Sequence, residues 1–312
     1  MRVFVTGASG WIGSSLVPEL MGAGHQVVGL ARSDASADAL TAVGAGVHRG
    51  SLDDVDGLRS AAAASDGVIH LAFKHEMAFS GDFDGAVQAD RRAVEAFGEA
   101  LAGSDRPFVL ASGLAGLVPG RVSTEEDGHD IDPYDTANPV SGPRGRHATA
   151  QLTLALASRG IRTSVVRLPP TVYGAGDPGF MATLVGVARK TGVSGYVGDG
   201  TARWPGVHRL DAAHLFRLAL EGAPAGSTLH AAGDEGVALR VVAEVIGRHL
   251  DLPTVSIAPD EAGPHFGWVG PFLGLDCPSS SRITRELLGW QPTRPGLIDD
   301  LETGHYFHTS AG

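Results

Sequence analysis

The first twenty residues constrain the fold more than any other part of the chain. A β-rich run at Val3–Val5 leads into the glycine-rich segment Thr6–Gly13, after which Ile12, Leu16 and Leu20 repeat with the period of a helix. Three glycines in such a turn allow the backbone to bend tightly, to approach a pyrophosphate and to pack the helix on the sheet. The free N–H groups of the helix start favour the same anion. The segment therefore predicts a dinucleotide-binding turn formed by Thr6, Gly7, Ser9, Gly10, Trp11, Ile12 and Gly13.

Strand and helix patterns alternate through the first half of the sequence. Strands are expected at 3–5, 26–30, 47–48, 67–73, 107–112 and 162–168, and helices at 37–42, 53–63, 83–101 and 146–159. Alternation of this kind is typical of parallel βαβ units with right-handed crossovers. The pattern predicts an α/β fold built on a parallel sheet.

The pattern loosens after Leu168, where prolines and glycines interrupt it. Helices are still expected at 180–190, 211–221, 238–250 and 281–288, with a strand at 228–231. No flexible linker separates the two halves, so we expect two packed units that share a cleft. Residues 1–174 are assigned to a dinucleotide-binding domain to which 205–232 return, and residues 175–204 and 233–312 to a substrate-binding lobe.

Charge and composition exclude several classes of partner. Lys and Arg number 24 and Asp and Glu 35, which gives a net charge of −11 and no global attraction for nucleic acid or an anionic membrane. The single cysteine, Cys277, rules out a disulfide framework. Neither a signal peptide nor an apolar run of about 18 residues is evident, so we expect a cytoplasmic protein. The sequence also lacks a His-Glu-x-x-His motif and paired cysteines, so no metal site is expected.

The end of the second expected strand bears on the choice of dinucleotide. An Asp or Glu at this position usually bonds the ribose hydroxyls of NAD, whereas this chain has Arg32 and Ser33. Arginine pairs with a 2′-phosphate and serine can donate a hydrogen bond to it. Asp34 is a contrary feature, and a solvated loop arginine is the alternative interpretation. The residues favour NADP(H) over NAD(H).

Five segments, in this order along the chain, carry a resemblance to a known family: Thr6–Gly13, His70–Ala72, Ser112, Arg167–Gly174 and Val207–Asp211. With them the chain resembles the extended, epimerase/dehydratase-like branch of the short-chain dehydrogenase/reductase superfamily. The resemblance implies a Rossmann-type doubly wound parallel sheet with a smaller C-terminal substrate lobe.

The resemblance also implies which strand ends touch the cofactor. The residues expected to contact the adenine are Ser51 and Leu52. Those expected to run under the ribose are Leu71, Ala72 and Phe73. Those expected to line the nicotinamide are Leu168, Pro169, Pro170, Thr171 and Val172. Lys74, next along the chain, is expected to reach the diphosphate or the nicotinamide ribose.

The active site implied by the resemblance is incomplete. Ser112 matches the hydroxyl that bonds the reacting oxygen, but the usual tyrosine and lysine fall at Gly142 and Arg146. Arginine can still bond ribose hydroxyls, yet a pKa above about 12 makes it a poor proton donor. His75 follows the fourth strand, at the sheet edge where ligands bind, so the proton is expected from His75 or from water.

These features favour an NADP(H)-dependent oxidoreductase that acts on a small carbonyl or alcohol substrate through Ser112, His75 and Arg146. Two alternatives stay open: a nucleotide-sugar epimerase or dehydratase, and a non-catalytic dinucleotide-sensing protein. A homodimer is one possible assembly.

Overall fold

The large domain is built on a seven-stranded parallel sheet. The computed structural model of the chain describes residues 1–118, 120–135 and 140–308. The strand order is β10-β6-β5-β4-β1-β2-β3, and every neighbouring pair runs parallel. The strands are β1 (Arg2–Thr6), β2 (Gln26–Ala31), β3 (Gly46–Arg49), β4 (Gly67–His70), β5 (Pro107–Gly113), β6 (Arg162–Leu168) and β10 (Ser227–His230). The expectation of a Rossmann-type α/β fold is confirmed.

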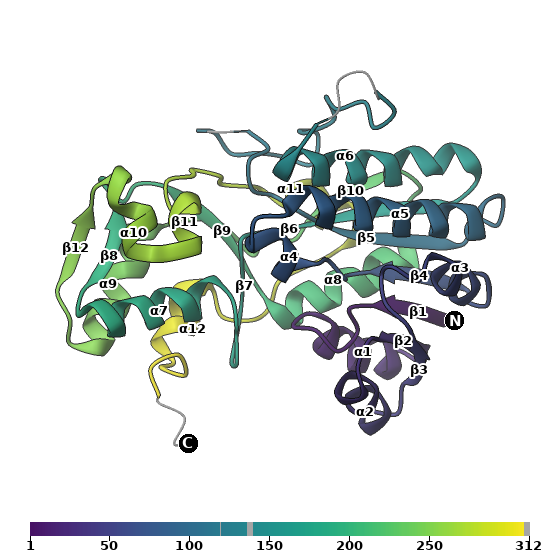
Figure 1. The fold of residues 1–312 in the computed structure, drawn as a ribbon, viewed down its shortest axis with the longest axis horizontal. Helices are drawn as coiled ribbons and strands as arrows, with labels where there is room; N and C mark the ends of the chain where they lie inside the picture. The colour runs from purple at the N-terminus through teal and green to yellow at the C-terminus, as the bar shows by residue number, and fades with distance from the viewer. Residues whose placement is uncertain (119, 136–139, 309–312) are drawn as a thin grey trace.

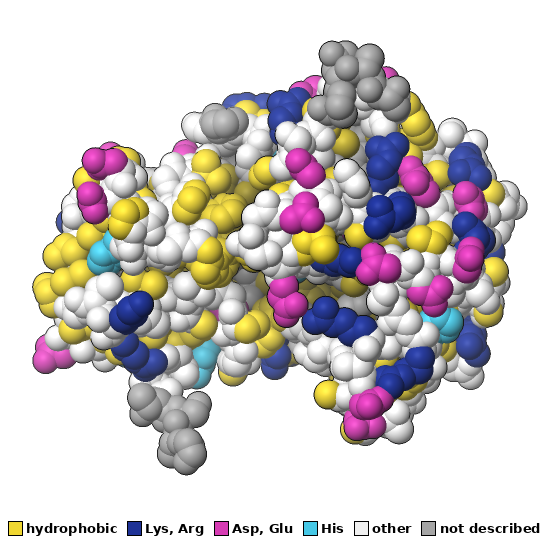
Figure 2. Space-filling model, viewed as in Figure 1, with side chains coloured by type: hydrophobic (Ala, Val, Ile, Leu, Met, Phe, Trp, Pro, Cys, Tyr) yellow, Lys and Arg dark blue, Asp and Glu magenta, His cyan; other side chains and the backbone are white. Residues whose placement is uncertain are grey.

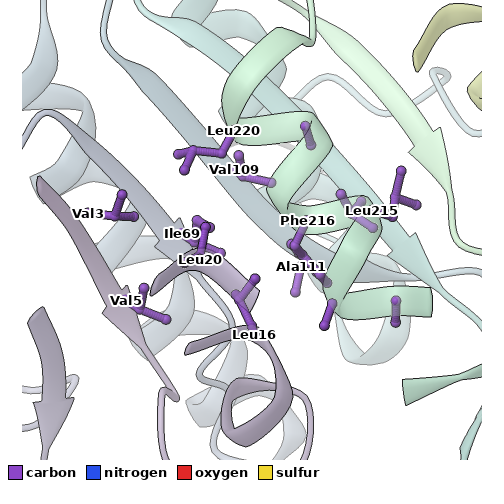
Figure 3. Packing of buried hydrophobic residues seen from close by; sticks show 14 of the residues in the cluster. Val3, Val5, Leu16, Leu20, Ile69, Val109, Ala111, Leu215, Phe216 and Leu220 are labelled. Atoms are coloured by element: carbon purple, nitrogen blue, oxygen red, sulfur yellow. The ribbon is translucent and has the colours of Figure 1, made fainter. Parts of the chain in front are cut away.

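Helices cover both faces of this sheet (Figure 1). One face packs against α1 (Gly13–Gly22), α2 (Asp34–Ala42) and α8 (Arg209–Gly222). The other packs against α3 (Val55–Ala63), α5 (Phe83–Leu101) and α6 (Gly142–Ala155), which continues as the 3₁₀ turn η1 (Leu156–Arg159). Figure 3 shows Leu16 and Leu20 of α1 and Leu215, Phe216 and Leu220 of α8 lying over Val5, Ile69 and Val109 of the strands. Burial of these side chains fixes the strand ends that carry the site.

A smaller lobe lies at the left of Figure 1 and has its own core around Trp204, Val242 and Phe266. It contains a three-stranded sheet, β11-β9-β7, and a two-stranded sheet, β12-β8. Its strands are β7 (Thr171–Tyr173), β8 (Ser194–Val197), β9 (Arg203–His208), β11 (Asp234–Ala238) and β12 (Thr254–Ile257). Its helices are α7 (Phe180–Thr191), α9 (Leu239–Leu250), η2 (Pro259–Glu261), α10 (Ala262–Phe266), η3 (Gly267–Phe272) and α12 (Leu297–Glu302).

The chain returns once more to the large domain near its end. Helix α11 (Arg282–Leu288) packs against β10 and α8, and Trp290 is fully buried in the large domain's core, where its indole N–H donates to the Asp211 carbonyl at 3.1 Å. Within the ranges described above, no helix is long and apolar enough to cross a membrane.

Several element boundaries differ from the sequence predictions. The fourth strand ends at His70 rather than residue 73, because the next residues turn into the short helix α4 (His75–Phe79). Helix α6 begins at Gly142 rather than residue 146, with Pro143 in its first turn. The strands β8, β9 and β11 were not predicted, because each contains glycine and β9 also contains Pro205, and both residues weaken a strand pattern.

Candidate functional site

The three glycines of the first turn have different structural roles. Gly7 has a φ of +68°, and a Cβ there would lie 2.9 Å from the Ala72 nitrogen. A Cβ on Gly13 would lie 2.1 Å from the Gly7 carbonyl oxygen, so both positions must be glycine for α1 to pack against β4 and the turn. A Cβ on Gly10 would approach only the Gly7 carbonyl oxygen, at 3.1 Å. Gly10 is exposed and leaves open space above the turn.

This open space has the properties of an anion cradle. In the parts of the chain that the structure describes, no acceptor receives the backbone N–H of Trp11 or Ile12 at the start of α1. Unpaired N–H groups at a helix start, beside a glycine without a side chain, suit the oxygens of a pyrophosphate. The residues present therefore fit the diphosphate of a dinucleotide.

Hydrogen bonds bring three of the expected cofactor segments together around this cradle. The Thr6 carbonyl accepts from the Leu71 N–H at 3.2 Å, and Thr6 Oγ1 accepts from the Ala72 N–H at 3.2 Å. The indole N–H of Trp11 donates to the Val172 carbonyl at 2.8 Å. The glycine turn, Leu71–Phe73 and the Leu168–Val172 segment thus surround one space at the carboxyl ends of the strands.

Two arginines, rather than one, lie at the neighbouring ends of β2 and β3. Arg32 is largely exposed, with its Nη2 3.9 Å from Glu76 Oε1, and Ser33 caps α2 by accepting the Ser36 N–H at 3.2 Å. Arg49 donates to the Ser33 carbonyl at 2.5 Å and pairs with Asp34. Arg49 was missed at the sequence level, although it ends β3, which pairs with β2 in a register that places it opposite Ala31. The carboxylate of Asp34 therefore faces Arg49.

Two other expected cofactor positions have local partners. Ser51 Oγ accepts the Asp53 N–H at 3.2 Å, and Leu52 is buried after β3. Both carboxylate oxygens of Asp53 accept from Lys74 Nζ, at 2.7 Å each. These two bonds use two of the three N–H donors of Lys74.

The structure places Ser112 and Arg146 at the same edge of the sheet. Ser112 lies near the end of β5 with 2% of its surface exposed, and Arg146 is the fifth residue of α6. Arg146 Nη2 donates a long hydrogen bond of 3.4 Å to the carbonyl of Ala111, the residue before Ser112. Among the described residues, neither Ser112 Oγ nor Arg146 Nε has a hydrogen-bond partner, although both atoms are inaccessible to solvent. Buried donors without partners are rare in folded proteins, so these two groups are candidate contacts for a ligand oxygen.

Beneath this pair lies a buried chain of polar groups. The Thr6 hydroxyl lies 2.5 Å from His70 Nδ1, and His70 Nε2 lies 3.1 Å from Asp90 Oδ1. Among the described residues, His70 Nε2 has no hydrogen-bond partner, so its contact with Asp90 is one of proximity only. Burial lowers the pKa of the Arg146 guanidinium, and the charge of Asp90 partly offsets this shift.

His75 begins α4 at the mouth of the site. Its ring lies 5.1 Å from that of Phe73 and stacks on Phe79 at 5.7 Å between centroids. The ring is accessible from one side, yet the neighbouring protein desolvates it, and Arg146 adds a like charge. Desolvation and Arg146, opposed by Asp90, lower the pKa of His75 to about 4. His75 is therefore neutral at pH 7.

The position at which the resemblance expects a tyrosine is Gly142, the first residue of α6. Gly142 has a φ of +57° and open space where a Cβ would stand. Tyr173 is buried in the small lobe, where its hydroxyl donates to Asp234 Oδ2 at 2.9 Å. Desolvation and the Asp234 carboxylate raise the pKa of Tyr173, which makes it a poor acid. Tyr134 is 57% exposed in the connection before α6.

The parallel sheet and the glycine turn define a Rossmann-type α/β protein. A profile of the NAD dependent epimerase/dehydratase family matches residues 3–231, and the chain belongs to that family. The described residues contain no group of three or more His, Cys, Asp or Glu able to hold a metal ion.

Curated relatives and solved structures extend over nearly the whole chain. An uncharacterised protein of Schizosaccharomyces pombe, C2A9.02, is 44% identical over 98% of this chain and all of its own length. A 4-hydroxy-2-methyl-3-oxo-4-farnesyl-3,4-dihydroquinoline-1-oxide ketoreductase of Stigmatella aurantiaca is 28% identical over 86% of this chain and 80% of its own. The structure of MoeE5 in complex with UDP-glucose and NAD superposes with a TM-score of 0.73 at 22% identity, covering 98% of this chain and 97% of that one.

Proposed function

We propose that the protein is an NADP(H)-dependent oxidoreductase that interconverts a carbonyl and an alcohol on a small-molecule substrate. The observation that carries this proposal is the pair of buried, unpartnered donors, Ser112 Oγ and Arg146 Nε, at the end of β5. A substrate oxygen between them satisfies both groups. The guanidinium then stabilises the negative charge that develops on this oxygen, as preorganised donors do in other active sites.

The remaining groups have supporting roles. A bound nicotinamide supplies the hydride for reduction, or accepts it in the reverse direction. Arg146 also reaches the nicotinamide ribose, and Asp90 with His70 holds a compensating charge beneath it. His75, neutral at pH 7 because its pKa is lowered to about 4, donates a hydrogen bond to the substrate oxygen, as a neutral imidazole can. The lowered pKa favours water as the source of the proton.

The cofactor residues are assigned by their strand ends. Gly7, Gly10 and the N–H groups of Trp11 and Ile12 would hold the pyrophosphate, and Ser51 and Leu52 the adenine. Leu71–Phe73 and the Leu168–Val172 segment would contact the nicotinamide. Arg32, Ser33 and the additional Arg49 support a 2′-phosphate, and this choice of NADP(H) rests on their charge.

The substrate is proposed to lie between the two units of the chain. Residues 175–204 and 233–312 form its binding lobe, except for α11 and Trp290, which pack on the large domain, and residues 1–174 with 205–232 hold the dinucleotide, except for β7 and most of β9, which belong to the sheet of the lobe. The relative that acts as a ketoreductase supports a carbonyl substrate. The absence of a tyrosine at Gly142 weighs against the base-initiated oxidation that an epimerase needs.

Single-turnover fluorescence of NADPH tests the function. The protein, preloaded with NADPH, is mixed with a panel of aldehydes, ketones, enones and UDP-glucose, and loss of nicotinamide fluorescence is followed. Oxidation by a ketone or aldehyde supports the proposal. Gain of reduced-nicotinamide fluorescence when the protein is instead preloaded with NADP⁺ and mixed with UDP-glucose supports an epimerase or dehydratase, and tight NADPH binding without turnover on any substrate supports a sensor.

A further inference from the structure

A continuous row of aromatic rings connects the region of Ser112 and Arg146 to the small lobe. It begins at Phe73, whose ring lies 4.1 Å beneath the Arg146 guanidinium, and passes through His75 to Phe79. Phe79 stacks on Trp268 of the small lobe with 4.8 Å between centroids and 29° between planes. We call this set the aromatic row; it comprises Phe73, His75, Phe79, Trp268, Phe272 and Phe180.

The row crosses from one unit of the chain to the other. Phe79 ends α4 of the large domain, whereas Trp268 and Phe272 belong to η3, and Phe180 begins α7. Phe79 also approaches Phe272 at 6.3 Å, and Phe180 approaches Trp268 at 5.1 Å. Figure 2 shows hydrophobic side chains gathered between the small lobe and the large domain, on the face that carries α4 and α10 in Figure 1.

The aromatic row differs from the buried core of the protein in how much of its surface is exposed to solvent. Trp204 and Trp290 are fully buried, at 1% and 0% exposure, and each has a hydrogen bond to a carbonyl. Trp268 and Phe79 keep 40% and 42% of their surface exposed, although they stack on each other. Exposed aromatic surface that continues into an active site costs free energy unless a ligand covers it.

The charge around the row selects against a nucleotide. The segment from residue 249 to residue 281, which carries Trp268 and Phe272, contains four acidic residues and neither Lys nor Arg. Three arginines elsewhere in the small lobe already have partners: Arg189 the Phe307 carbonyl, Arg203 the carboxylate of Asp276, and Arg240 that of Glu244. A nucleotide diphosphate on the segment from residue 249 to residue 281 would meet its four carboxylates, and no Lys or Arg of the same segment would compensate them.

We propose that the aromatic row binds a planar, apolar portion of the substrate, whose carbonyl then reaches Ser112 and Arg146. This inference rests on the proposed function and names its substrate class: aromatic or conjugated ketones rather than nucleotide sugars. Because the centroids of Phe79 and Trp268 are 4.8 Å apart, no third ring fits between them. The substrate therefore lies along the exposed edges of the rings, in edge-to-face contact.

Equilibrium dialysis with the full chain and NADP⁺ tests this class without requiring turnover. The ligands are 2-acetonaphthone as a flat apolar ketone and UDP-glucose as a nucleotide sugar. The variants are Trp268→Ala, Trp268→Phe, Phe79→Ala, and Leu287→Ala as a control on an exposed apolar residue of α11. Circular dichroism identifies any variant that does not fold, in which case Phe79→Ala and Trp268→Phe carry the test.

We expect wild type to bind 2-acetonaphthone, and Trp268→Ala and Phe79→Ala each to weaken that binding by about tenfold. Trp268→Phe should recover most of the affinity, Leu287→Ala should match wild type, and NADP⁺ binding should not change. Equal ketone affinity in wild type and both alanine variants would overturn the inference, as would tighter binding of UDP-glucose than of the ketone. If the ketone binds through Trp268 but is never reduced, the aromatic site stands and only the proposed reaction fails.

Discussion

The guanidinium of Arg146 lies over the ring of Phe73, with 4.1 Å between its Cζ and the ring centroid. Arg146 belongs to α6, and Phe73 follows β4, so this contact holds the cation at the ends of β4 and β5. A desolvated guanidinium over an aromatic face is favourable by about 2 kcal/mol. The cation therefore keeps a fixed position beside Ser112 in the absence of a substrate.

The first prediction concerns this cation. Arg146→Met keeps much of the side-chain volume but removes the charge, so turnover should fall about 10²–10³-fold, as when one preorganised donor is lost from an active site. NADPH affinity should fall much less, because the turn and the strand ends still hold the cofactor. Stopped-flow reduction rates and cofactor titrations measure the two quantities. If both fall by the same factor, Arg146 acts through the cofactor ribose alone.

Arg146→Lys provides the matched control. A buried lysine keeps a charge that desolvation disfavours, so its rate should rise as pH falls over a range where wild type is level. No such difference between the two profiles would mean that the charge at this position does not act on the reaction.

The second prediction separates two glycines of the same turn. In Gly10→Val the added side chain projects into the cradle and meets only the Gly7 carbonyl, so the variant should fold but bind either cofactor at least about tenfold more weakly. In Gly13→Ala the Cβ would lie 2.1 Å from the Gly7 carbonyl oxygen, so this smaller change should lower the melting temperature instead. A folded Gly10→Val with unchanged cofactor binding would place the dinucleotide elsewhere.

Local patterns predict the large domain better than the site. The run Val3–Val5 and the helical repeat of Leu16 and Leu20 specify β1 and α1, because burial on one face is a local property of sequence. The pairing of Arg49 with Asp34 depends on the register between β2 and β3, which no local pattern encodes. If the strands that precede Arg32 and Arg49 are assumed to be parallel neighbours in the sheet, Arg49 is expected near Ala31.

Long-range contacts explain what the sequence could not predict in the catalytic region. Phe79 and Trp268 are far apart in the chain and meet only when the small lobe packs against α4. His75 is correctly expected at the mouth of β4, but its pKa depends on burial and on Arg146, which arrives from α6. The strand β9 escapes prediction because Pro205 and Gly206 oppose a strand pattern that pairing with β7 and β11 overrides.

The third prediction concerns the preference between cofactors. Arg32→Ala should weaken NADPH binding by roughly 1.5–3 kcal/mol, the range for a hydrogen bond to a charged group, and leave NADH binding nearly unchanged. Arg49→Ala should act in the same direction, and it also frees Asp34 to repel the 2′-phosphate. Isothermal titration calorimetry with both cofactors measures the ratio. Equal affinities of wild type for NADPH and NADH would remove the basis for an NADP(H) site.

The fourth prediction follows from the low pKa of His75. Because His75 is neutral above about pH 4, its titration should add no limb to the pH–rate profile between pH 5 and 8. His75→Phe keeps the ring between Phe73 and Phe79 but removes both nitrogens, whereas His75→Ala removes the ring as well. If the imidazole donates a hydrogen bond to the substrate, both variants should lose turnover, and His75→Ala should lose at least as much as His75→Phe. Full activity in His75→Phe with a loss in His75→Ala would show that only the aromatic contact matters.

The fifth prediction concerns stability in acid. His230 is fully buried, its Nδ1 lies 2.9 Å from the Ser280 carbonyl, and desolvation and Arg167 lower its pKa to about 3. Between pH 3 and the ordinary pKa near 6.5, His230 is protonated in the unfolded chain but stays neutral in the folded protein. The free energy of unfolding should therefore decrease as pH falls from about 6.5 to 3. His230→Gln should flatten this dependence in urea titrations at several pH values, while His308→Gln, at an exposed position, should retain it. A His230→Gln variant whose stability falls with acid as steeply as that of wild type would show that other groups, such as His147, whose pKa burial lowers to about 4, dominate the acid transition.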